Sequence, residues 1–437
     1  MNPVKYLIKG AILPNGDQKD IAIQDGVITA VSQNLSATSL SEQIVIDAKA
    51  SRVLPGLVDV HTHLRQPGRE DAETVLTGSR AGAKGGFTAL SAMANTSPVA
   101  DSAGVVEQVF RLGQEAGYLD VFPIGAVTEG LLGQSLSEIG AMADSVARVR
   151  IFSDDGNCVF DPLLMRRALE YVKKFGGVIA QHAQDPRLTL GSQMNEGEIS
   201  ARLGLKGWPS VAEEAIIARD VLLAEHVKSR LHICHVTTAG GVEIIRWAKA
   251  RGIEVTAEVT PHHLLLTDEL ASTYDPVFKV NPPLRTATDV HALREALAEG
   301  VIDIVATDHA PHPTESKECE WQEAAFGMLG LETALSIVQK TMVDSGLMDW
   351  QQVAERMSHA PARIGGYQNQ GQEIAVGSSA NLVVIDPSRN WQVDRDLTMS
   401  KATNTPYHGH TLPGVVTHTF FKGHATVLDS VVQKIGE

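Results

Sequence analysis

Residues 58–68 read VDVHTHLRQPG, and the fold prediction for the whole chain starts from this stretch. The largely apolar run 57–60 has the length of a buried strand and leads directly into His61 and His63. Alternate residues of a strand face the same side, so both imidazoles point in one direction. Arg65 joins them if the chain stays extended. Two imidazoles at the end of a buried strand raise the question of what they bind.

Similar apolar runs recur along the middle of the chain and alternate with helical patterns. The candidate strands are 57–60, 87–92, 121–126, 150–153, 178–181, 231–234, 253–259 and 302–306. About eight strands that alternate with helices predict an α/β fold of the (β/α)8 TIM-like barrel type. A doubly wound sheet is the alternative. It is less favoured because no GxGxxG turn follows an early strand.

Three helices of this region carry their own end signals. The helix expected at 210–226 begins with Ser210 and Glu213, which have the spacing of a capping box. Two further helical patterns end at Gly252 and Gly300, as is typical of a residue just beyond a helix C-terminus.

Both ends of the chain have a β pattern. The segment DIAIQDGVITAV (20–31) places Asp25-Gly26 between two short apolar runs, a hairpin signal, and TFFKGHATVLD (419–429) has two strands around Lys422-Gly423. Neither end has enough apolar surface to stand alone. We therefore expect residues 1–55 and 366–437 to form one small β-sandwich domain, with the barrel, 56–365, inserted between them.

Composition excludes several classes of protein. The 437 residues include 37 basic and 52 acidic side chains, a formal net charge of −15, which argues against a nucleic-acid surface or binding to an anionic membrane. Three cysteines without a CxxC pair, and no signal-peptide pattern, predict a reduced, cytoplasmic protein. No stretch approaches the ~18 apolar residues of a membrane span.

Polar side chains follow the predicted strands at the point where each strand ends. They are Asn95, Asp154, Asp155, His182, His235 and Asp308. In a barrel the carboxyl ends of the strands share one rim, where active sites are built. These residues therefore predict that His61 and His63 bind a metal together with other nitrogen and oxygen ligands.

The ligand types indicate the metal and its chemistry. Imidazole and carboxylate suit Zn²⁺. Four histidines and two carboxylates are too many for one tetrahedral ion and suit two ions that share a carboxylate and a hydroxide. Such a centre activates water and polarises a carbonyl, which predicts attack on an amide or ester. A single strand-end histidine is more often structural, so the prediction depends on the whole set.

Several neighbouring residues receive a structural interpretation instead. His262 and His263 can line the same rim, but we expect a structural role for them. Cys234 is expected to pack in the core, pointing away from His235. Adjacent residues of a strand diverge, so Asp154 and Asp155 do not both bind metal easily.

With these residues in view, the chain resembles the amidohydrolase superfamily and, within it, the type I (long bacterial) dihydroorotases. The resemblance covers nearly the whole chain. It rests on PGLVDVHTHLRQPG (55–68), MANTSP (93–98), FSDDG (152–156), VNPPLR (280–285), ATDHAPH (306–312), AFGMLGLE (325–332) and the two strand-end histidines. The HxHLR and TDHAPH pair is the most specific part.

The resemblance implies a role for each metal-facing residue. His61 and His63 would bind the more buried of two Zn²⁺ ions, and His182 and His235 the second. Many relatives bridge the metals with a carboxylated lysine, but FSDDG has none, as in the type I enzymes, where an aspartate takes that place. Asp155, 27 residues before His182, aligns with this bridge, and Asp154 is the alternative.

The resemblance also implies the substrate contacts. Asp308 would be both a metal ligand and the proton carrier. The substrate would be held by His63, Arg65, Asn95, Asn281, His312 and the backbone around Phe326-Gly327. The segment 310–326, rich in charges and turn formers, is expected to be an active-site loop that closes over the substrate.

The implied activity is the zinc-dependent, reversible cyclisation of N-carbamoyl-L-aspartate to (S)-dihydroorotate in de novo pyrimidine (UMP) biosynthesis. The alternatives are a hydantoinase, dihydropyrimidinase or allantoinase, which usually carry the lysine bridge and lack the arginine after HxH, and an inactive scaffold, which usually loses ligands. The expected partner is the small-molecule substrate. A homodimer and a complex with aspartate carbamoyltransferase are compatible with the resemblance.

Overall fold

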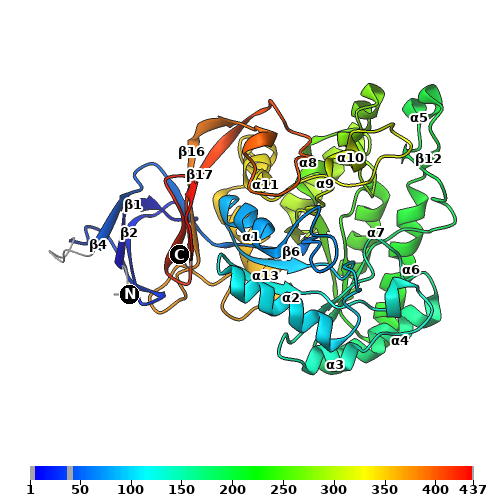
Figure 1. Cartoon of the computed structure of the whole chain (residues 1–437), viewed down its shortest axis with the longest axis horizontal. Coiled ribbons are helices and arrows are strands. Elements are labelled where there is room, and N and C mark those ends of the chain that lie inside the picture. The colour runs from blue at the N-terminus through cyan, green and yellow to red at the C-terminus, as the bar shows by residue number, and fades with distance from the viewer. Residues whose placement is uncertain (1–4, 37–42, 436–437) are drawn as a thin grey trace.

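Two kinds of sheet make up the α/β fold of the computed structural model, which describes residues 5–36 and 43–435. One sheet combines strands from both ends of the chain, and the others are parallel and come from its middle (Figure 1). Residues 1–4, 37–42 and 436–437 of the expected terminal pieces lie outside the described part.

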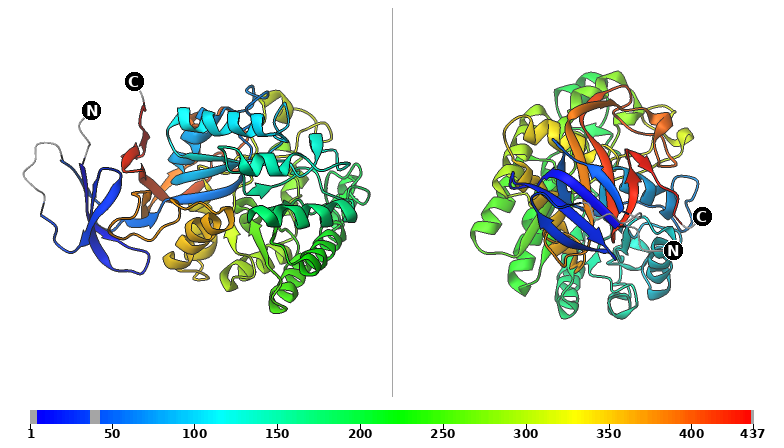
Figure 2. Two further views of the ribbon diagram at one scale, coloured as in Figure 1. Left: turned by 90° about the horizontal axis from the view of Figure 1, so that it is seen from below. Right: turned by 90° about the vertical axis from the view of Figure 1, so that its left-hand side faces the viewer.

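The mixed sheet has nine strands. They are β1 (Lys5–Ile12), β2 (Gln18–Gln24), β3 (Val27–Ser32), β4 (Gln43–Asp47), β5 (Arg52–Pro55), β16 (Leu382–Gln392), β17 (Thr411–Phe421), β18 (His424–Leu428) and β19 (Val431–Val432). The order is β19-β18-β17-β16-β5-β1-β2-β3, with β4 beside β1. Antiparallel pairing of β16 with β5, Leu382 opposite Pro55, joins the two ends of the chain. This sheet lies at one end of the molecule (Figure 2).

Both predicted hairpins are confirmed. Strands β2 and β3 pair antiparallel across Asp25-Gly26, where both residues have positive φ, 51° and 84°. Strands β17 and β18 pair across Lys422-Gly423, with φ of 49° and 76°. Two-residue hairpin turns need such angles because they match the twist of the strands, and glycine adopts them without strain.

The parallel strands match the predicted positions closely. They are β6 (Leu57–Thr62), β7 (Phe87–Ala92), β8 (Asp120–Pro123), β9 (Ile151–Phe152), β10 (Val178–Gln181), β13 (Leu231–Ile233), β14 (Val255–Val259) and β15 (Ile304–Val305). One sheet is β6-β7-β8 and the other β15-β14-β13-β10-β9. Isolated parallel bridges, Gly125 with Phe152 and Thr62 with His309, connect the sheets at both edges.

Helices follow most of the parallel strands and lie outside them (Figure 1). They are α1 (Val75–Lys84), α2 (Ala103–Ala116), α3 (Ile139–Asp144), α4 (Pro162–Val172), α6 (Val211–Val227), α7 (Ala239–Ala250), α9 (Ala287–Glu299), α11 (Ala334–Val338), α12 (Trp350–Ala354) and α13 (Ala360–Gly365). Shorter elements lie in the loops: α5 (Glu198–Leu203), α8 (Pro261–Leu265), α10 (Thr314–Lys317), β11 (Met194–Asn195) and β12 (Gly207–Trp208).

The helix-end predictions met different outcomes. Gly252 follows Arg251, the C-cap of α7, and Gly300 directly follows α9; both have positive φ, 74° and 84°, as expected at a helix C-terminus. The capping box at Ser210 was wrong, because Ser210 is itself helical and its side chain makes no cap bond. The carboxylate of Glu213 instead accepts hydrogen bonds from Thr237 and Thr238, so a tertiary contact replaces the local one.

The parallel strands share a buried apolar cluster. Their inward side chains form one buried cluster that includes Val60, Met93, Ile124, Ile151, Val178, Ala180, Cys234, Ile304 and Ala306. A larger cluster fills the space between strands and helices. Packing on both faces fixes the strands and therefore the polar residues at their carboxyl ends. No helix in 5–36 and 43–435 is long and apolar enough to cross a membrane.

Candidate metal centre

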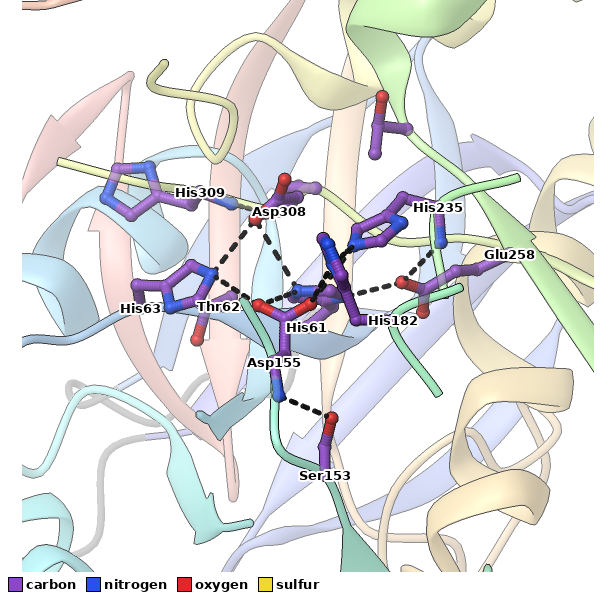
Figure 3. A network of polar contacts seen from close by, with 12 residues as sticks. His61, Thr62, His63, Ser153, Asp155, His182, His235, Glu258, Asp308 and His309 are labelled. Carbon is purple, nitrogen blue, oxygen red and sulfur yellow. Dashed lines mark hydrogen bonds and ion pairs between the residues drawn. The ribbon is translucent and has the colours of Figure 1, made fainter. Parts of the chain in front are cut away.

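Six of the sequence-predicted residues converge at the carboxyl ends of the parallel strands (Figure 3). They are His61 and His63 at the end of β6, Asp155 after β9, His182 after β10, His235 after β13 and Asp308 after β15. Each is at most 5% exposed. Imidazole and carboxylate groups buried this deeply need partners, so their mutual arrangement defines the site.

Asp155 lies at the middle of the cluster. Its Oδ1 is 3.0 Å from both His182 Nδ1 and His235 Nε2. Its Oδ2 is 3.5 Å from His61 Nε2 and 3.4 Å from His63 Nε2. One carboxylate oxygen thus faces each pair of histidines, the arrangement expected of a group shared by two ions.

Asp308 lies against the first pair of histidines. Its Oδ1 is 3.0 Å from His63 Nε2 and 3.5 Å from His61 Nε2. Burial alone would raise the pKa of Asp308, but the charge of His61 and the hydrogen bond from His63 outweigh it and lower the pKa to about 2. The same balance holds the pKa of Asp155 well below its usual range.

Asp154 is turned away from the cluster. Its Oδ1 accepts the backbone N–H of Val127 at 2.8 Å and of Thr128 at 3.0 Å, and its Oδ2 accepts the Thr128 hydroxyl. Adjacent residues diverge, as the sequence predicted. The structure therefore brings Asp155, and not Asp154, to the histidines.

The donor set fits a metal. Within these six residues, three overlapping groups have ligand atoms within 4.8 Å of one another: His61, His63 and Asp155; His61, His235 and Asp308; and Asp155, His182 and His235. Two ring nitrogens, His182 Nδ1 and His235 Nε2, approach to 2.9 Å while facing the same carboxylate oxygen. His61 Nε2 is buried without a hydrogen-bond partner. Converging nitrogen and oxygen donors of this kind indicate a cation site.

Glu258 on β14 supports the cluster from behind, and sequence reasoning missed it. Its Oε1 lies 2.5 Å from His61 Nδ1 and accepts the His235 backbone N–H at 3.1 Å, while Oε2 is 3.0 Å from His232 Nε2. A bond at Nδ1 fixes the ring so that Nε2 faces the centre. The available signal was a carboxylate between two apolar residues of a predicted strand, VTAEV, where a buried charge needs partners.

Asp59 and Cys234 also lie next to the centre. Asp59 accepts the backbone N–H groups of His61 and Thr307, which ties β6 to the chain after β15, and burial raises the pKa of its carboxyl to about 7. Cys234 belongs to the core, as expected, but its sulfur also lies within 4.8 Å of ligand atoms of His61 and Glu258. Burial raises the pKa of this thiol, so it stays protonated.

Arg65 does not follow the extended path that the sequence analysis assumed. Strand β6 ends at Thr62, and Arg65 has a positive φ of 61°. The guanidinium is nevertheless buried near the centre: its Nε donates to Pro311 O at 3.1 Å, and its Nη2 is 3.5 Å from His312 Nε2. A left-handed turn, and not strand alternation, brings Arg65 to the site.

The two asparagines also approach the cluster. Asn95 Oδ1 lies 2.9 Å from His63 Nδ1 and so orients that ring. Asn281 Nδ2 donates to Gln184 Oε1 at 3.3 Å, and its buried Oδ1 has no hydrogen-bond partner. The same Gln184 oxygen is 2.6 Å from His182 Nε2, a contact that the sequence did not predict.

The expected active-site loop, 310–326, is folded onto the rim and contains α10. His312 Nε2 donates to Phe326 O at 2.8 Å, and Gly327 N–H donates to Lys279 O at 2.9 Å. Gly327 has a φ of 140°, and a Cβ there would lie 2.8 Å from the Ala310 and His312 side chains. Arg65, His312 and the Phe326 carbonyl therefore lie next to one another.

The neighbouring histidine pair is buried beside the site. His263 bonds to the Thr260 hydroxyl and to Pro282 O, which is the structural role expected. His262 Nε2 has no hydrogen-bond partner, and burial lowers the pKa of this imidazole to about 4.

Known proteins resemble this chain in sequence and in fold. A family model described as dihydro-orotase-like matches residues 51–240. A dihydroorotase of Streptomyces coelicolor is 64% identical over 425 residues, which cover 97% of this chain and 99% of that protein. A dihydroorotase of Leifsonia xyli subsp. xyli is 61% identical over 437 residues, which cover 100% of this chain and 99% of that protein.

Solved structures of cyclic-amide hydrolases share the fold. The L-hydantoinase (dihydropyrimidinase) from Arthrobacter aurescens has a TM-score of 0.86 and 26% identity, covering 98% of this chain and 97% of that one. The dihydropyrimidinase from Brevibacillus agri has a TM-score of 0.83 and 21% identity, covering 98% of this chain and 96% of that one. This similarity shows the fold alone.

Proposed function

This chain belongs to the dihydroorotase family, and on that premise we propose that its buried cluster catalyses the reversible cyclisation of N-carbamoyl-L-aspartate to (S)-dihydroorotate and water in pyrimidine (UMP) biosynthesis. The observation that carries the proposal is Asp155, whose two oxygens face two pairs of histidines, with the Arg65 guanidinium buried nearby. The first feature suits hydrolytic chemistry, and the second suits a substrate with a carboxylate.

Two Zn²⁺ ions fit this donor set. His61 and His63 would hold one ion, His182 and His235 the other, with Asp155 shared and Asp308 facing the first. Zinc in this place supplies the Lewis acidity that polarises a carbonyl and favours deprotonation of water. Glu258 and Gln184 hold the His61 and His182 rings from behind, so the chain presents the donor nitrogens in fixed orientations.

Asp308 is the residue we assign to proton transfer. In ring closure the ureido nitrogen attacks the side-chain carboxylate carbon, the N–C bond forms, and Asp308 accepts the proton of that nitrogen. The C–O bond to one carboxylate oxygen then breaks, and this oxygen leaves as water with the proton from Asp308 and one proton from solvent. In ring opening Asp308 returns the proton to the leaving nitrogen. His63 and His61 hold its Oδ1 in place, so its position next to the first pair of histidines supports the assignment.

Recognition of the substrate carboxylate falls to Arg65. A guanidinium can meet a carboxylate with two parallel hydrogen bonds, and His312 lies beside it. Asn95 and Asn281 would add neutral hydrogen bonds, together with His63 and the backbone at Phe326-Gly327. Arg65 Nε donates to Pro311 O, and His312 Nε2 donates to Phe326 O, so substrate binding would exchange those bonds for bonds to the carboxylate.

The two parallel sheets and the bridges between them support a closed (β/α)8 barrel, residues 56–365. The nine-stranded sheet supports a composite β domain, a β sandwich built from 1–55 and 366–437. The cytoplasmic location, a homodimer and a complex with aspartate carbamoyltransferase stay predictions.

A hydantoinase is the alternative that one observation favours, because the hydantoinase fold covers nearly the whole chain. Three observations weigh against it. Sequence identity to dihydroorotases is 64%, against 26% to that hydantoinase. Asp155 takes the place where the lysine bridge would be, and Arg65 provides a partner for an anion that hydantoin lacks. An inactive scaffold is disfavoured because every expected ligand position is filled.

The test is metal content together with turnover of dihydroorotate and of hydantoin. We expect zinc-dependent turnover of dihydroorotate and almost none of hydantoin. Near neutral pH ring closure consumes a proton, so the apparent equilibrium should shift about tenfold, ~1.4 kcal/mol, per pH unit. Rapid hydantoin hydrolysis, or an equilibrium unchanged between about pH 6 and 8, would contradict the proposal.

A further inference from the structure

The chain that joins β16 to β17, residues 393–410, leaves the nine-stranded sheet and reaches the metal-centre rim. In Figure 1 the far ends of these orange and red strands lie beside α11, with the joining chain near α8. Ser400 and the Lys401 backbone N–H donate to buried Glu73, and the Met399 N–H donates to Glu332 at 2.7 Å. The segment is therefore anchored before it reaches the substrate loop.

Asn404 in this segment contacts both ends of the loop. Its Oδ1 accepts the His312 backbone N–H at 3.2 Å. Its Nδ2 donates to Ala310 O at 3.0 Å and to Gly327 O at 3.2 Å, and its own carbonyl accepts the Leu329 N–H at 3.2 Å. The residue is 6% exposed. One amide thus uses both donor hydrogens and its acceptor on backbone groups of two segments.

Those two segments are the ones that carry the proposed loop contacts to substrate. The backbone N–H of His312 donates to Asn404, and the backbone carbonyl of Gly327 accepts from Asn404. The middle of the loop is held separately: Lys317 Nζ donates to Lys279 O and Ala325 O, and Lys279 Nζ donates to Trp321 O and Gln322 O. The two ends meet through Asn404 and also through direct bonds: Ala310 N–H donates to Met328 O at 3.0 Å, and His312 Nε2 donates to Phe326 O at 2.8 Å.

We propose that Asn404 is a positioning residue for substrate recognition, through which the C-terminal β strands set the distance between His312 and Phe326-Gly327. The expected change in KM rests on the proposed function, whereas the expected change in the loop structure does not. Among residues 5–36 and 43–435, the Asn404 side chain bonds to backbone groups at the two ends of the loop, so it acts through the loop and not on the reacting atoms. Binding of substrate then depends on a residue outside the parallel strands.

Asn404→Ala tests this, with Asn381→Ala as the matched control. Asn381 is also 6% exposed and lies at the start of β16; its Nδ2 donates to Asn369 O and its Oδ1 accepts the Lys422 N–H. It has the same kind of bonds but none to the loop. For Asn404→Ala we expect KM for dihydroorotate to rise about tenfold while kcat falls less than about threefold. Asn381→Ala should leave both nearly unchanged.

Hydrogen exchange provides a readout that does not depend on turnover. Exchange of the His312 amide and of the peptide around 326–329 should become faster in Asn404→Ala, with zinc content unchanged. In Asn404→Asp a carboxylate oxygen can still accept the His312 N–H. The other carboxylate oxygen replaces the donor Nδ2 and cannot donate to Ala310 O and Gly327 O. In this variant the His312 amide should stay protected, while hydrogen exchange around Gly327 should become faster. The proposal can therefore still be tested if Asn404→Ala does not fold stably.

The outcomes separate the two proposals. Unchanged KM and unchanged loop exchange in Asn404→Ala would overturn the positioning role, as would an equal rise of KM in Asn381→Ala. If wild type does not turn over dihydroorotate, the proposed function fails. The exchange comparison then still tests whether Asn404 holds the loop.

Discussion

The metal centre and the loop 310–327 lie side by side but are built on different principles. Side chains of the centre project from the ends of strands packed on both faces, and imidazoles and carboxylates contact each other directly. In the loop, backbone carbonyls are the acceptors, and the side chains of Lys317, Lys279 and Asn404 hold them. In the proposed function, the groups assigned to chemistry are thus fixed by the packed strands, whereas the groups assigned to substrate recognition depend on a backbone conformation that side chains maintain.

This difference predicts how each region responds to change. Loss of one group in the centre leaves buried charges without partners and removes the metal. Loss of one group at the loop shifts a backbone segment and leaves the metal in place. The variants below test this contrast, in order of expected effect.

Asp155→Ala should have the largest effect. Removal of the shared carboxylate should empty the centre of metal and lower kcat/KM by about a thousandfold or more, since groups that act as a unit fail together. Zinc content and steady-state kinetics on dihydroorotate measure it. The control is Asp154→Ala, which removes bonds to Val127 and Thr128 and should cost about 1–3 kcal/mol of stability but keep the metal. Zinc loss in the control alone would reverse the assignment.

Arg65→Met lies between the two regions and should have the next largest effect. Removing one partner of a desolvated charge pair costs about 2–5 kcal/mol, so kcat/KM for dihydroorotate should fall roughly thirtyfold to several thousandfold with zinc retained. Arg65→Lys should recover only part of the loss, because an ammonium cannot make the paired hydrogen bonds of a guanidinium. Undiminished turnover in a zinc-replete Arg65→Met would exclude the carboxylate role.

Glu258→Gln tests the support behind the centre. The His61 ring loses its charged partner, so we expect zinc affinity or activity to fall about ten- to a hundredfold. A chelator competition titration measures the affinity. Glu213→Gln is the matched control, since Glu213 is also a buried carboxylate but bonds to Thr237 and Thr238. Equal zinc loss in both variants would show a general effect of removing a buried charge.

The loop should open more easily in acid, with the smallest effect of the four. Burial, then the charges of Arg65 and Lys317, lower the pKa of His312 from 6.5 to about 3. An opened loop binds a proton that the closed loop excludes, so stability is present above pH 6.5 and is lost as pH falls toward 3. Each pH unit below 6.5 should favour opening by up to about tenfold.

Hydrogen exchange of 310–327 at two pH values, corrected for intrinsic rates, measures this effect. His312→Gln should remove most of the pH dependence, because the amide does not titrate. A variant that keeps the full dependence would assign it to another group.

The sequence predicted the metal centre better than the loop, for a physical reason. Apolar strand runs followed by histidine or aspartate mark strand ends directly, so His182, His235 and Asp308 could be placed in advance. Glu258 was missed because it lies inside a strand and its partners come from other strands. Asn404 was missed because its contacts are to backbone far away in sequence, and no pattern marks such contacts. The prediction of an extended backbone up to Arg65 was wrong, because the strand pattern of a sequence does not show where a residue adopts a left-handed conformation.

The pairing of β5 with β16 can form only late in synthesis of the chain, because β16 lies far after β5 in the sequence. Translation delivers β1 to β5 first, then every metal-facing residue, and β16 only after them. Ser358 donates to the carbonyl of Gly56 across 302 positions, and Leu382 pairs with Pro55, so both are late partners of early chain. Such distant contacts form slowly because a long loop must close first. Until β16 has been synthesised, β5 therefore keeps an open edge toward other chains, and the nascent chain has its metal-facing side chains before it has Asn404.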